Sequence, residues 1–142
     1  MIVNTAYIYM GNGGAPVNPN LWQDGVSNYP VEFTNSSISS EGLKFTLAPG
    51  TATFSELPLT HFNSLTLTGR RTSGGSQADV DIGINFYSSD NTPIGAITVT
   101  FKKSGNSVAV DIPSSAKIPN AKIKIEKAKY GSDATLSSAL LS

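Results

Sequence analysis

Residues 78–87 read Ala78-Asp79-Val80-Asp81-Ile82-Gly83-Ile84-Asn85-Phe86-Tyr87, a nearly unbroken alternation of apolar and polar side chains. Successive side chains of a β-strand point to opposite faces of the sheet, so the alternation sorts them into two sets. The apolar set is Val80, Ile82, Ile84 and Phe86, and the polar set is Asp79, Asp81, Asn85 and Tyr87. Two such faces predict an antiparallel strand with one side on a hydrophobic core and the other in water.

The same alternation of apolar and polar residues recurs along most of the chain. Five further runs alternate in this way, at 43–47, 65–68, 97–101, 108–112 and 121–126, and turn-forming clusters at 88–93 and 103–107 separate neighbouring runs. This pattern predicts an all-β fold, a single antiparallel β-sandwich of jelly-roll type. The best helical candidate is the tail at 133–141, which Asp133 could cap, but a closing strand is at least as good an interpretation.

The first residues stand outside this array. Gly11-Asn12-Gly13-Gly14-Ala15-Pro16 is too rich in glycine, proline and asparagine for regular structure. We therefore expect residues 1–17 to form an extended N-terminal arm with a glycine-rich loop, and residues 18–142 to form the β-sandwich domain.

Composition excludes several classes of function. Charged residues make up only 14% of the chain, against roughly 25% in an average domain. The ten basic and ten acidic residues balance, which argues against nucleic acid or an anionic membrane as a partner. The chain has no cysteine and one histidine, so disulfides, thiolate metal sites and histidine clusters are excluded. The start lacks the basic region and apolar stretch of a secretory signal, so we expect assembly in the cytoplasm.

Catalytic patterns are weak, and the sequence predicts a protein that is not an enzyme. His61 lies between Leu59 and Phe62 with no nucleophile motif nearby, so a loop or strand-edge histidine is the simpler interpretation. Asp79 and Asp81 are two residues apart on one strand, about 7 Å, a spacing that would suit a pair of glycosidase carboxylates. Any exposed strand with two acidic residues has the same spacing, so a lone hydrolase is only a distant third interpretation.

A structural calcium ion is the one cofactor that the sequence leaves open. Asp79, Asp81, Asp90 and Asn91 carry the oxygen ligands that calcium prefers, although no EF-hand spacing occurs.

Five lysines stand between Lys117 and Lys129, where Glu126 is the only acidic residue. We interpret this cluster as an edge or outer-sheet strand kept soluble by lysines, in preference to a contact with phosphate or teichoic acid.

Aromatic residues in polar surroundings suggest a carbohydrate ligand. Sugar-binding sites use such rings because the apolar face of a pyranose lies flat on them, while amides and carboxylates bind its hydroxyl groups. The polar set of residues 78–87 combines one ring with an amide and two carboxylates, and we expect Trp22 and Arg70 at the edge of the same site. The alternative for Trp22 is a plug at one end of the sandwich, and for Tyr87 a strand end under a loop.

The order of these segments resembles the galactose-binding-like and carbohydrate-binding-module jelly rolls. The resemblance rests on Ala78–Tyr87 with the turn Ser88-Ser89-Asp90, on Val108-Ala109-Val110-Asp111-Ile112-Pro113, and on Asn20-Leu21-Trp22-Gln23-Asp24-Gly25. It covers roughly residues 18–142. The families' acidic residue before the last strand is replaced here by Ser137-Ser138. The resemblance implies a jelly roll that contacts polysaccharide.

A free-standing, cysteine-free β-protein of this composition also looks like an accessory structural protein of tailed phages. That resemblance implies a virion component on the tail or capsid, with other virion proteins as partners, host cell-surface polysaccharide as ligand, and a homo-oligomeric state. The alternative is a purely architectural decoration or fibre protein, which docks through residues 1–17 and binds no glycan.

Overall fold

The computed structural model describes residues 9–10, 16–46, 49–73, 79–128 and 133–142. Two five-stranded antiparallel sheets account for most of them. We call the first the β10 sheet. Its strands, in spatial order, are β11 (Pro93–Lys102), β10 (Asp79–Tyr87), β13 (Ala121–Lys127), β8 (Gly50–Leu57) and β5 (Val31–Thr34).

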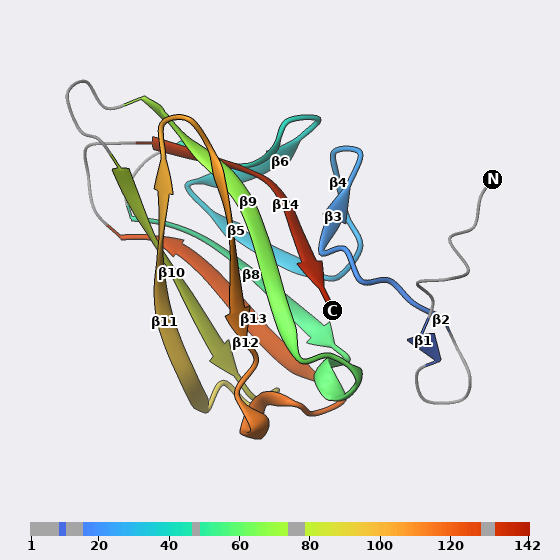
Figure 1. The fold of residues 1–142 in the computed structure, drawn as a ribbon. Helices are drawn as coiled ribbons and strands as arrows, with labels where there is room; N and C mark the ends of the chain where they lie inside the picture. Colours follow the sequence, from blue (N-terminus) through green and yellow to red (C-terminus); the bar gives the residue numbers. More distant parts are fainter. Residues whose placement is uncertain (1–8, 11–15, 47–48, 74–78, 129–132) are drawn as a thin grey trace.

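The second sheet, which we call the β9 sheet, packs against the first. Its strands, in spatial order, are β12 (Asn106–Asp111), β9 (Ser64–Ser73), β14 (Asp133–Leu141), β7 (Gly42–Phe45) and β6 (Ser36–Ser39). In Figure 1, β9 (green) and β14 (red) run side by side, and a short turn connects β11 and β12, which are edge strands of the two different sheets. The prediction of an all-β antiparallel sandwich of jelly-roll type is confirmed.

The tail folds as a strand. β14 pairs with β9 on one side and with β7 on the other, so it lies in the middle of its sheet. A register shift between Leu136 and Ser138 inserts one extra residue, which is a β-bulge. The bulge explains the irregular apolar pattern, since Leu136 and Ala139, three residues apart, both face the core. The closing strand is therefore the correct interpretation, and the helical one is wrong.

Short elements complete the described part of the chain. β1 (Tyr9–Met10) pairs with β2 (Pro16–Val17), and β3 (Trp22–Gln23) pairs with β4 (Val26–Ser27). Asp24 and Gly25, which join β3 to β4, both have positive φ, as a two-residue hairpin turn requires. Two single-turn 3₁₀ helices follow, η3 (Leu59–His61) and η4 (Ser114–Ala116). No helix in the described ranges is long and apolar enough to cross a membrane.

The N-terminal arm is described only in part. Residues 1–8 and 11–15 lie outside the described residues, so the structure does not describe the glycine-rich loop. Val17 is buried and belongs to the core cluster of the sandwich. The division at residue 17 stays a prediction.

The core lies between the two sheets and holds the apolar faces that the alternation predicts. Phe54, Phe62, Phe86 and Phe101 are its largest fully buried side chains. Trp22 joins them, with 3% of its surface exposed and its ring stacked on Phe54 at 5.7 Å between centroids. Burial of rings of this size contributes on the order of 1.5–3 kcal/mol each.

Two basic side chains lie inside the sandwich. Lys127 is 3% exposed because it shares the inner face of β13 with Ile123 and Ile125, and Arg71 is 6% exposed on the inner face of β9. The Lys127 Nζ lies 4.0 Å from a carboxylate oxygen of Asp133. The lysine cluster therefore does not act as one surface, since Lys122 and Lys124 face outward while Lys127 faces the core.

Candidate functional site

The six residues predicted to bind a ligand lie in three separate places. Asp79, Asp81, Asn85 and Tyr87 alternate with buried residues along β10, so the prediction that they share an outer face is confirmed. Arg70 projects from the outer face of the β9 sheet, on the opposite side of the sandwich.

Trp22 belongs to neither face. It lies in the core, where its Nε1 donates a hydrogen bond of 3.2 Å to the Ser137 carbonyl. Its ring is covered by Phe54, so it is not open to a sugar. This corrects its placement at the edge of the site: Trp22 is the plug that the alternative interpretation describes. The physical reason is that burying an aromatic ring this large outweighs leaving it in a polar loop.

The outer face of β10 is already occupied by contacts within the protein. Asp81 accepts a hydrogen bond of 2.8 Å from the Thr100 hydroxyl on β11. Tyr87 carries the Lys124 ammonium group over its ring, 5.5 Å from the centroid. A cation–π contact of this kind holds the lysine where a sugar ring would otherwise stack.

The donors predicted for calcium do not come together. Asp90 accepts hydrogen bonds from the Ser88 hydroxyl and, at 2.8 Å, from the Thr92 hydroxyl; these bonds, that of Ser88 first, hold the pKa of its carboxyl below the usual value. Asn91 Oδ1 accepts from the Lys122 ammonium group at 2.8 Å, which leaves that oxygen facing a cation. Among the described residues no three histidine, cysteine or acidic side chains converge. Asp79, Asp81, Asp90 and Asn91 therefore do not converge on one calcium site, and a structural calcium ion stays a prediction.

A row of side chains on the outer face of the β9 sheet surrounds Arg70. Strand register places Thr135 of β14 directly between Lys44 of β7 and Arg70 of β9, with Ser37 of β6 next to Lys44. Adjacent strands are about 4.8 Å apart, so Lys44 and Arg70 leave the sheet about 10 Å from each other. Thr135 between them is buried although it faces outward, because the longer neighbours cover it.

Two hollows lie on this face, one on each side of Arg70. The first has a volume of about 280 Å³ and lies toward the start of β14. The second, about 420 Å³, lies toward the turn between β11 and β12. Glu41, Arg70 and Thr135 line both hollows. The other residues lining the second hollow are Thr68, Gly69, Ser104, Gly105, Asn106, Ser107 and Ser137. We call the two hollows together the β9 groove.

The floor of the β9 groove depends on two close backbone approaches. A Cβ atom added at Gly42 would lie 2.0 Å from the Leu136 carbonyl oxygen, and one at Gly69 would lie 2.9 Å from the Thr135 carbonyl oxygen and 2.5 Å from the Leu136 side chain. Only glycine fits at these two positions, and β14 passes tightly between them. The bulge then turns Ser137 outward, where its hydroxyl donates to the Thr68 carbonyl at 3.2 Å. Across β9, the Thr68 and Ser107 hydroxyls are 2.7 Å apart.

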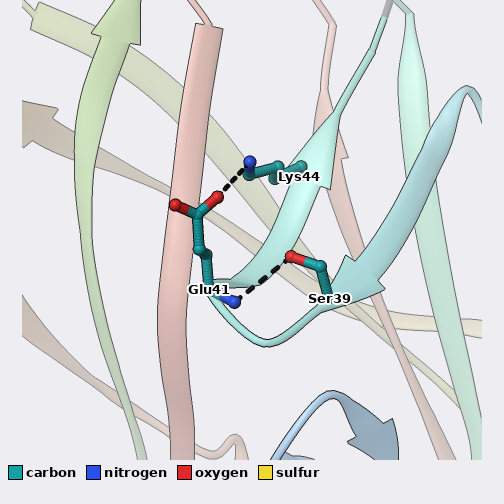
Figure 2. Close-up of polar contacts among 3 residues, drawn as sticks. All are labelled: Ser39, Glu41 and Lys44. Carbon is teal, nitrogen blue, oxygen red and sulfur yellow. Dashed lines mark hydrogen bonds and ion pairs between the residues drawn. The ribbon is translucent and has the colours of Figure 1, made fainter.

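One wall of the groove is the turn between β6 and β7. The Ser39 hydroxyl accepts a hydrogen bond of 3.2 Å from the Glu41 amide, which orders this turn. Figure 2 shows the Glu41 carboxylate and the Lys44 ammonium group pointing toward each other, and they form an ion pair. The Lys44 hydrogen bond and charge, with a smaller contribution from Arg70, hold the pKa of Glu41 below its usual value.

His61 lies at the end of η3 and is exposed. The prediction that it is a loop or strand-edge histidine is confirmed, since η3 is a single turn between β8 and β9.

Comparisons with known proteins identify the fold. No family model and no curated protein matches the sequence. Solved structures do match. A CBM36 carbohydrate-binding module, solved in complex with calcium and xylotriose, is 14% identical, with a TM-score of 0.57 over 81% of this chain and 94% of that one. TmCBM61, in complex with β-1,4-galactotriose, is 13% identical, with a TM-score of 0.55 over 88% and 94% of the two chains. CsCBM6-3 from Clostridium stercorarium, in complex with cellobiose, is 15% identical, with a TM-score of 0.53 over 81% and 88%.

These neighbours confirm the resemblance to carbohydrate-binding-module jelly rolls as a likeness of fold. The phage resemblance finds no counterpart in them.

Sequence reasoning found Arg70 but missed the residues around it. Glu41 lies in a turn, Lys44 is a polar position in the four-residue strand β7, and Thr135 is a polar position in β14, with no motif to mark any of them. Only strand pairing between residues about 65 and 90 positions apart brings Arg70, Thr135 and Lys44 into one row.

Proposed function

We propose that this protein is a non-catalytic polysaccharide-binding module, and that the β9 groove is its binding face. The observation that carries the proposal is the groove itself, two adjoining hollows of about 280 and 420 Å³ lined by hydroxyl, amide and charged groups. Ligand sites are concave and place a few polar groups to fix orientation. A groove open at the surface suits a chain-like ligand.

Three further features support this function. Solved carbohydrate-binding modules share the fold, and those cited were solved with oligosaccharides bound. In the described part of the chain, Asp79 and Asp81 lie on an exposed face of β10, and the Thr100 hydroxyl donates a hydrogen bond to Asp81. Hydroxyl groups such as Thr68 and Ser107 both donate and accept hydrogen bonds, as sugar hydroxyls require.

The outer face of β10 remains the second candidate binding face. It presents Tyr87, the kind of ring on which a sugar can stack, with Asn85 beside it. A ligand there would have to displace Lys124 from the ring.

Blocking variants distinguish the two faces. Ser107→Trp puts a bulky ring into the second hollow, and Thr98→Trp is its matched control, an exposed hydroxyl position on the outer face of the β10 sheet. We expect retention on immobilised xylan, galactan, glucan or acidic polysaccharides to fall at least tenfold for Ser107→Trp and to stay unchanged for Thr98→Trp. Loss of retention with Tyr87→Ala alone would move the site to β10. Absence of binding to every polysaccharide tested would favour the architectural alternative.

The biological setting of the protein, a phage particle, is a separate part of the proposal. A virion component, assembled with other virion proteins and present as a homo-oligomer, stays a prediction from the resemblance to phage accessory proteins. Its test is the genomic neighbourhood together with the protein content of purified particles, and particles lacking the chain would refute it. Deleting residues 1–16 tests the architectural alternative, which expects loss of particle incorporation while the rest of the chain stays folded.

A further inference from the structure

Arg70 is the basic side chain that the two hollows of the β9 groove share. It is exposed and lines both hollows. Across the described ranges its guanidinium group forms no hydrogen bond or ion pair, and its only interaction is the weak effect on the pKa of Glu41. A guanidinium group offers five donors in a planar fork, which matches the two oxygens of a carboxylate.

Several other basic side chains in the described part of the molecule are engaged with neighbours. Lys44 pairs with Glu41, Lys122 donates to Asn91, and Lys124 lies over Tyr87. The Lys44–Glu41 pair is exposed, and exposed pairs contribute little, so Lys44 can exchange Glu41 for a ligand group. The groove therefore presents one free cation and one exchangeable cation about 10 Å apart.

The described lining of the groove also lacks an exposed aromatic ring, on which a neutral sugar could stack. Among its described lining residues the only aromatic side chain is Phe45, which is buried. Without stacking, a neutral glycan would exchange hydrogen bonds with water for hydrogen bonds with the protein, a small net gain. Charge-assisted hydrogen bonds to a carboxylate are about twice as strong and, with arginine, bidentate.

Acidic residues in the groove limit how much negative charge a ligand can carry. Glu41 lines both hollows and Asp133 lines the first, so a densely charged polyanion would meet repulsion there. A polymer with spaced carboxylates can place one at Arg70 and avoid both.

We propose that the ligand is an acidic polysaccharide, and that the Arg70 guanidinium group binds the carboxylate of a uronate unit. This inference rests on the proposed polysaccharide-binding function and names the substrate class of the same groove. The carboxylate accepts two hydrogen bonds from Arg70, while the hydroxyls of Thr68, Ser107 and Ser137 bind the sugar beside it.

The test compares each acidic polymer with its own neutral form. The probes are hyaluronate, which carries one carboxylate on every second sugar, and polygalacturonate and alginate, which carry one on every sugar. Each is tested beside the methyl-esterified form that has the same backbone and no charge. We expect at least one acidic form to bind at least about tenfold more tightly than its ester. That binding should weaken as salt rises. Arg70→Ala should remove the preference, and Arg70→Lys should restore only part of it, since an ammonium group cannot make the bidentate contact.

The control is Lys102→Ala, which removes an exposed cation from the β10 sheet at the far face. It should leave the preference unchanged. Equal binding of acid and ester forms, or a preference that survives Arg70→Ala, would overturn the inference. If neutral xylan or galactan binds and Ser107→Trp abolishes it, the proposed function stands and only the acidic ligand class falls. Binding to no polysaccharide overturns both.

Discussion

Gly42 is the position at which the backbone geometry most strongly requires glycine. The backbone there has φ of +114°, and a Cβ atom would lie 2.0 Å from the Leu136 carbonyl oxygen and 2.8 Å from the Ser137 Cα. The contact is with backbone, so β7 would have to move away from β14 to relieve it. The matched control is Gly83, where a Cβ would lie an ordinary 3.7 Å from the Asn85 side chain.

The expected loss follows from two effects. A side chain at this φ costs about 1–3 kcal/mol of backbone strain, and forcing extra volume into a packed region costs about 1–3 kcal/mol more. Together they lower the free energy of unfolding by about 2–6 kcal/mol, out of the roughly 5–15 kcal/mol of an ordinary domain. At roughly 3 °C per kcal/mol for a chain of this length, the melting temperature should fall by roughly 6–18 °C.

Urea denaturation of Gly42→Ala and Gly83→Ala measures the difference. We expect the midpoint to fall steeply for Gly42→Ala. For Gly83→Ala it should stay level or rise slightly, because alanine reduces the entropy of the unfolded chain where the native backbone accepts it. If the two variants are equally stable, β7 does not pass against the Leu136 carbonyl as described, and the floor of the β9 groove is built differently.

Two further outcomes follow from Trp22, which is buried, and Tyr29, which is partly buried. Trp22→Phe keeps a ring on Phe54 but loses the hydrogen bond to the Ser137 carbonyl, so it should lower the free energy of unfolding by about 1–3 kcal/mol. Trp22→Ala also removes the ring and should lower it by about 3–5 kcal/mol. If urea denaturation finds the stability of both variants unchanged, Trp22 is not a buried plug. Burial raises the pKa of Tyr29 to about 12. Its contribution to stability is therefore complete below the unfolded pKa near 10, and it is lost as the pH rises from there through the folded pKa. Ultraviolet titration should show one tyrosine that ionises at a higher pH than the others, and Tyr29→Phe should remove that step.

The candidate site was predictable only in part. Sequence alternation correctly placed Asp79, Asp81, Asn85 and Tyr87 on one face, because the faces of a strand follow from local geometry. It could not show that Lys124 lies over the Tyr87 ring, since that contact comes from a strand nearly forty residues later. Trp22 looked exposed because its sequence neighbours are polar, but its partner Phe54 comes from another strand.

By itself, the sequence determined the all-β class and the inner faces of the six alternating runs, because a two-residue period depends on neighbouring side chains alone. It also determined that ionic contacts would be sparse, through its 14% charged residues. Only the tertiary structure decided that Arg70 lies beside Thr135 and near Lys44, that Lys127 is enclosed, and that Gly42 and Gly69 hold β14 between them. These features depend on which strands pair and in what register, and pairing is set by how the whole core packs together, which no local pattern records.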